Sequence, residues 1–89
     1  MYEIIFSEES LNDIDEIKAF IELDNRIISE KVVSSIMNTI QYLSVFPQLG
    51  VLKNGDSREI VESVYKYKIR YKLINNLIYI FTIYKYQNK

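Results

Sequence analysis

The spacing of apolar residues changes at Pro47, and this change divides the chain into a helical part and a strand part. Before Pro47, apolar side chains recur every three or four positions, which is the period of amphipathic helices. From Tyr65 to Leu73 they alternate with charged side chains, which is the period of a strand with one buried face. Helices followed by strands in this order predict an α+β fold.

Two helices are predicted before Pro47. The first spans about residues 8–22, because Ser7 can cap it and acidic residues occupy its first turn, where the helix dipole favours negative charge. Asp24–Asn25 break the pattern and can cap the second helix. This second helix is expected to end near Phe46–Pro47, because proline disfavours helical backbone in the residue before it. The short connection predicts an antiparallel helical hairpin.

β-branched and aromatic runs predict four strands, at residues 2–6, 58–62, 65–73 and 77–84. Gly50 and Asn54–Asp56 mark a loop before the second of these strands. Asn75–Asn76 can supply the two positive-φ positions of a type I′ turn between the last two strands. The expected fold is an N-terminal strand, an antiparallel helical hairpin and a three-stranded antiparallel meander, with the helices packed on one face of the sheet.

The length of 89 residues fits one small domain, which we expect to cover residues 1–89. The chain has no cysteine and no histidine, which excludes disulfides, thiol nucleophiles, classical zinc sites and imidazole acid–base chemistry. Its longest apolar run, Leu77 to Tyr84, is far shorter than the roughly 20 residues of a membrane helix. We therefore expect a cytoplasmic protein with no cofactor and no membrane contact.

Charge is distributed unevenly along the chain. Residues 1–49 carry three basic and nine acidic residues, a net charge of −6, whereas residues 50–89 carry eight basic and three acidic residues, a net charge of +5. Such asymmetry indicates an anionic partner for the second part. An alternative interpretation is that the two parts neutralise one another within the folded monomer.

The predicted strand at residues 65–73 concentrates the positive charge. Successive residues on one face of a strand lie about 6.5–7 Å apart, so four basic side chains form a row there: Lys66, Lys68, Arg70 and Lys72. With neighbouring tyrosines such as Tyr84 and Tyr86, this row is typical of a surface for single-stranded nucleic acid or for an acidic partner. The alternative interpretation of the row is an exposed sheet face, where lysines maintain solubility and hinder pairing with the edge strand of another molecule.

Five segments spread along essentially the whole chain carry a family pattern: Phe6–Ser7, Leu11–Ile14, Tyr42–Gly50, Arg58–Val61 and Tyr67–Tyr71. The last of these is similar to a Tyr-Arg-Ile-Val-Tyr strand. In this order the segments resemble the RelE/ParE superfamily, whose members are toxins of type II toxin–antitoxin modules. The resemblance implies a cognate antitoxin as partner. The RelE-like branch cuts mRNA on the ribosome, and the ParE-like branch poisons DNA gyrase.

The resemblance also assigns roles to individual positions. Lys68 falls where the RelE-like branch usually has a catalytic or phosphate-binding arginine, and Arg58 matches an arginine that the superfamily tends to share. Tyr84 falls where many members have a histidine. Lys85 and Tyr86 lie in the tail that supplies basic or aromatic residues in active nucleases. The long helical hairpin and the Phe-Pro-x-x-Gly turn look more like the ParE-like branch.

Three hypotheses follow for the function. The favoured one is a ParE-like inhibitor of gyrase. The residues expected to bind a nucleic acid or a partner protein are Lys66, Arg70, Lys72, Lys85 and Tyr86. The alternative is a ribosome-dependent, metal-independent mRNA endonuclease that uses Lys68, Arg58 and Tyr84, with Lys68 and Arg58 both on the sheet face away from the helices. The third is a non-toxic domain of the same fold that only binds an antitoxin.

Overall fold

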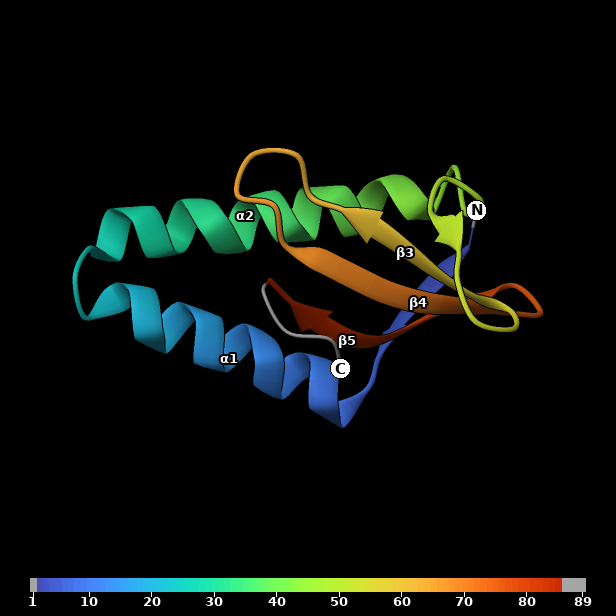
Figure 1. The fold of residues 1–89 in the computed structure, drawn as a ribbon, viewed down its shortest axis with the longest axis horizontal. Helices are drawn as coiled ribbons and strands as arrows, with labels where there is room; N and C mark the ends of the chain where they lie inside the picture. Colours follow the sequence, from blue (N-terminus) through green and yellow to red (C-terminus); the bar gives the residue numbers. More distant parts are fainter. Residues whose placement is uncertain (1, 86–89) are drawn as a thin grey trace.

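The computed structural model describes residues 2–85. The elements along the chain are β1 (Glu3–Phe6), α1 (Glu8–Glu22), α2 (Arg26–Leu43), β2 (Val51–Leu52), β3 (Ser57–Val61), β4 (Lys68–Ile74) and β5 (Leu77–Tyr84). The strands form one sheet in the order β1-β5-β4-β3-β2, in which β1 is parallel to β5 and the other pairs are antiparallel. Both helices lie on the same face of this sheet (Figure 1). The predicted α+β fold, with its hairpin and meander, is confirmed.

Capping residues set the ends of the helices. The Ser7 hydroxyl accepts a hydrogen bond from the Ser10 amide at 2.9 Å, and the Asn25 side chain accepts one from the Ile28 amide at 3.0 Å. Helix α2 ends at Leu43, three residues before the predicted Phe46. The reason is Ser44, whose hydroxyl and backbone N–H both donate to the carbonyl of Gln41 and so close the last turn.

The sheet differs from the predicted one at three places. Val51–Leu52 form a short edge strand beside β3, where the sequence predicted only a loop. Strand β4 begins at Lys68, and the predicted start at Tyr65 is wrong, because Lys66 has a φ of 70° and its amide closes a turn onto the carbonyl of Glu62. In the β4–β5 turn Asn75 alone has positive φ, at 56°.

The hydrophobic core lies between the sheet and the helices. One face of α2 supplies Val32, Ile36, Ile40 and Leu43, and strands β4 and β5 supply Ile69, Tyr71, Ile78, Ile80 and Ile83. Alternation along β4 therefore points Ile69 and Tyr71 towards the helices and leaves Lys68, Arg70 and Lys72 on the opposite face. Within the described part of the chain, neither helix has the length and hydropathy that a membrane span requires.

Candidate functional site

The sheet face away from the helices carries the cations of β4. Lys68, Arg70 and Lys72 lie half-buried along it. Lys66 is not part of the row, contrary to the prediction, because the turn before β4 holds it outside the strand. The row therefore has three cations rather than four.

A buried carboxylate lies in the middle of this row. Glu59 on β3 is the cross-strand partner of Arg70, and its side chain is only 8% exposed. The Arg70 Nε donates to Glu59 Oε1 at 3.2 Å, and the hydroxyl of Tyr84 donates to the same oxygen at 2.6 Å. The Lys53 ammonium lies 3.9 Å from Glu59 Oε2. In these four residues, the Glu59 cluster, the carboxylate of Glu59 offsets one of the positive charges of this face.

Contacts within the Glu59 cluster determine the protonation states of Glu59 and Tyr84. Burial alone would raise the pKa of Glu59, but the hydrogen bonds from Tyr84 and Arg70, together with the charge of Lys53, outweigh burial and lower it. Burial and the hydrogen bond to the Glu59 carboxylate both raise the pKa of Tyr84. Tyr84 therefore stays a neutral phenol at neutral pH and acts as the donor to an ionised Glu59.

Aromatic rings lie beside three of the lysines. The ammonium of Lys68 lies 5.7 Å from the ring centre of Tyr84, and that of Lys72 lies 6.0 Å from the ring of Phe81. Lys85 lies 5.2 Å from the ring of Tyr67. Cations within about 6 Å of an aromatic ring are attracted to its face. Tyr84 is only 5% exposed, so its ring is covered by its neighbours.

Arg58 lies on the opposite face from Lys68, so the prediction that they share a face is wrong. Arg58 is the cross-strand partner of Tyr71, which points to the core, whereas its neighbour Glu59 pairs with Arg70. The Arg58 Nη1 donates to the backbone carbonyls of Gln48 at 3.2 Å and Gly50 at 2.8 Å. The predicted catalytic set is therefore divided: Lys68 and Tyr84 are neighbours, and Arg58 holds a loop on the other side of the sheet.

The remaining predicted residues are only partly placed. Lys85 packs on Tyr67, and Tyr86 lies outside the described residues.

Glu59 was not predicted as a site residue, although its position next to Ile60 on a strand was a usable signal. Because Ile60 faces the core, Glu59 had to face the cations. Among residues 2–85, no three acidic side chains come together in a way that could hold a metal ion.

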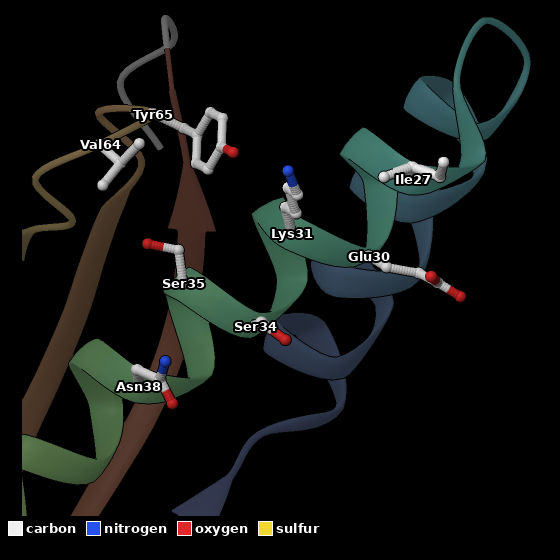
Figure 2. Close-up of a pocket in the computed structure, with 8 residues that line it drawn as sticks. All are labelled: Ile27, Glu30, Lys31, Ser34, Ser35, Asn38, Val64 and Tyr65. Carbon is white, nitrogen blue, oxygen red and sulfur yellow. The ribbon is translucent and has the colours of Figure 1, made fainter.

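A second concave surface runs along α2. Figure 2 shows a pocket on this surface, lined by residues of α2 and of the β3–β4 loop: Ile27, Glu30, Lys31, Ser34, Ser35, Asn38, Val64 and Tyr65. The loop is anchored by Glu62, which is fully buried and whose carboxylate accepts a hydrogen bond from the Ser35 hydroxyl at 2.7 Å. The lining combines polar, charged and apolar side chains.

Comparison with known proteins identifies the family. The family model for the ParE toxin of the type II toxin–antitoxin system parDE matches residues 4–87. The chain belongs to the ParE toxin family. It is therefore a toxin of a type II toxin–antitoxin system, and its predicted resemblance to the RelE/ParE superfamily is confirmed. A search of curated protein sequences found no significant match.

Solved structures show the same fold for ParE-family and RelE-family toxins. The chain is similar to one from the chromosomal ParDE system of P. aeruginosa, with a TM-score of 0.82, 16% identity and 98% of each chain covered. It is also similar to a chain of the intact E. coli RelBE toxin–antitoxin complex, with a TM-score of 0.71, 14% identity and 99% and 100% covered. The isolated E. coli RelE toxin gives a TM-score of 0.71 and 14% identity, with 100% of this chain and 88% of that chain covered.

Proposed function

We propose that this ParE-family toxin arrests growth as a non-catalytic, protein-binding inhibitor of DNA gyrase. The observation that carries the proposal is the Glu59 cluster, in which an internal carboxylate occupies the centre of the cationic sheet face. Metal-free RNA cleavage needs a base for the 2′-hydroxyl proton and cations around the negatively charged transition state. In this cluster the Glu59 carboxylate already occupies Arg70 and the Tyr84 hydroxyl, the groups that would otherwise contact a phosphate.

The individual residues support the same proposal. Arg70 already donates a hydrogen bond to Glu59, and the Tyr84 hydroxyl donates to the same oxygen atom. Arg58 is held by loop carbonyls on the other face of the sheet. The alternative, an mRNA endonuclease, would have to rely on Lys68 as its main free cation on this face. The ParE-like branch, which the superfamily resemblance associates with gyrase, requires no catalytic centre.

Replacing Lys68 with alanine separates the two mechanisms. In a broad protein interface most residues cost less than about 1 kcal/mol when truncated, so we expect Lys68→Ala to weaken toxicity by no more than about 10-fold. Loss of a transition-state cation would instead reduce cleavage about 100-fold or more. The measurement is growth inhibition after graded induction, with the SOS response and mRNA cleavage followed in the same cultures.

Lys72→Ala is the matched control, because Lys72 lies on the same face of the same strand and has no assigned role in cleavage. We expect the two variants to behave alike and wild-type toxin to induce the SOS response. Abolished toxicity in Lys68→Ala alone, with cut mRNA in wild-type cultures, would favour the endonuclease.

We further propose that a cognate antitoxin covers the cationic face with an acidic segment. The proposal is supported by the net charge of +5 over residues 50–89 and by the exposure of Lys53 and Lys72, whose side chains are 42% and 44% exposed. Electrostatic steering makes association fast at low salt and slower as salt screens it. We expect the association rate constant to fall steeply between low and high ionic strength, and a flat dependence would contradict the proposal.

A further inference from the structure

A long stretch of the chain carries no charge. Charged residues make up 26% of the sequence, yet none occurs between Lys31 and Lys53. These 21 uncharged residues cover most of α2, the loop after it and strand β2. We call their exposed surface the uncharged face. Depletion of charge is the compositional mark of the central part of a protein–protein interface.

The uncharged face also exposes large apolar side chains. Val51 points instead to the cationic sheet face with its cross-strand partner Glu59. Five others are more than half exposed: Tyr42 (62%), Val45 (56%), Phe46 (57%), Leu49 (56%) and Leu52 (54%). At on the order of 100 Å² each, these five present roughly 500 Å², which is within the range of the largest apolar patches on typical monomers. Two such faces together would bury about 1,000 Å², the area that a specific interface should clear.

Buried contacts hold the backbone of this face in place. The hydroxyl of Tyr71 donates to the carbonyl of Pro47 at 2.8 Å and accepts from the amide of Gly50 at 2.9 Å. Arg58 adds its hydrogen bonds to the carbonyls of Gln48 and Gly50. The apolar side chains therefore project from a fixed loop. Little conformational entropy is lost when such a surface binds a partner.

We propose that the uncharged face is a docking surface for a second copy of this chain, related by a two-fold axis. A two-fold contact places each patch against itself, so any net charge on the patch repels its own copy. The exposed side of α1 carries Glu8, Glu9, Asp15 and Glu16, and the outer face of β4 carries Lys68 and Lys72. Both of these surfaces would oppose like charges, whereas the uncharged face would not.

The same charges separate this contact from antitoxin binding. An acidic segment is attracted to the cationic sheet face, and the uncharged face offers it no partner for its carboxylates. In the sequence the uncharged stretch is bounded by Lys31 and Lys53, and Arg58 lies beside the loop, to whose carbonyls it donates. An apolar, charge-depleted centre is typical of contacts between identical subunits.

The test is the mass of the full-length toxin in solution, measured by analytical ultracentrifugation after release from its antitoxin and refolding. We expect a dimer of the 10.6 kDa chain with a dissociation constant on the order of 1–10 µM. Phe46→Glu places two unpaired carboxylates at the contact, and we expect it to raise the dissociation constant by about 100-fold or more. Leu23→Glu is the matched control, because Leu23 is 83% exposed at the tip of the helical hairpin; it should remain a dimer.

Far-ultraviolet circular dichroism verifies that Phe46→Glu and Leu23→Glu are folded. Leu49→Lys provides a second substitution on the uncharged face. We expect antitoxin binding to be unchanged in Phe46→Glu. Monomeric wild-type toxin at about 100 µM, well above the expected dissociation constant, would overturn the proposal. So would dimers that persist in both Phe46→Glu and Leu49→Lys, or loss of antitoxin binding in Phe46→Glu, which would assign the face to the antitoxin.

Discussion

Glu62→Ala is expected to destabilise the fold by about 3–5 kcal/mol, because it removes a buried charged acceptor and leaves several backbone donors without a partner. The carboxylate accepts hydrogen bonds from the amides of Val64 at 2.6 Å and Tyr65 at 2.9 Å, a weaker one from Tyr67 at 3.5 Å, and one from the Ser35 hydroxyl at 2.7 Å. Urea unfolding measures the change in the free energy of unfolding.

Ser35→Ala is the control for Glu62→Ala, because it removes one of these hydrogen bonds and leaves the carboxylate on the loop. We expect it to cost about 1 kcal/mol. Equal losses in the two variants would show that Glu62 does not organise the loop.

The carboxylate of Glu62 also makes the stability of the fold depend on pH. Burial alone would raise the pKa of Glu62, but hydrogen bonds from Ser35 and from the amides of Tyr65, Val64 and Tyr67 outweigh burial and hold the pKa below the ordinary value of 4.5. A lowered folded-state pKa stabilises the fold above about pH 4.5, and this contribution is lost as the pH falls towards the folded-state value. Glu62→Gln should therefore lose less stability than wild type below pH 4.5.

Gly50→Ala is expected to cost about 2–4 kcal/mol, because the position has no room for a side chain. An added Cβ would lie 2.7 Å from the Tyr71 hydroxyl, 2.8 Å from its ring and 3.0 Å from the carbonyl of Glu59. The ring of Tyr71 is fully buried and cannot move aside without breaking its hydrogen bonds to the loop. Thermal and urea unfolding would measure the loss.

Gly55→Ala is the matched control, because its Cβ would meet nothing within 4 Å and only its φ of 63° opposes the change. The cost of left-handed backbone for alanine is about 1–2 kcal/mol. If Gly50→Ala is no more destabilising than Gly55→Ala, the loop is not held by Tyr71 as described.

The predicted elements were accurate where the cause is local in the sequence. Ser7 and Asn25 cap the helices as expected, and the alternation of Ile69 with its charged neighbours identified the buried face of β4. The start of β4 could not be predicted in this way. Tyr65 to Tyr67 has the period of a strand, but the nearby carboxylate of Glu62 accepts hydrogen bonds from their backbone amides and forms a turn. This carboxylate is buried against Ser35 of α2, a contact between residues far apart in the sequence.

The candidate site was harder to predict, because it depends on pairing between strands. The sequence indicated the cations of β4 but gave no direct sign that Glu59 would accept hydrogen bonds from Arg70 and Tyr84, since the register of β3 against β4 decides which residues meet. The face of Arg58 could have been inferred: it lies two positions before Ile60, so the two side chains point the same way.

Supercoiling by purified DNA gyrase, with the toxin titrated into the reaction, tests the central claim most directly. Cleavage of mRNA in purified ribosome complexes is measured in parallel with the same toxin preparation, and toxin premixed with its antitoxin serves as the control for both. We predict that the toxin inhibits gyrase, that the antitoxin reverses this inhibition, and that the mRNA stays intact. Unimpaired supercoiling together with cut mRNA would contradict the proposed function.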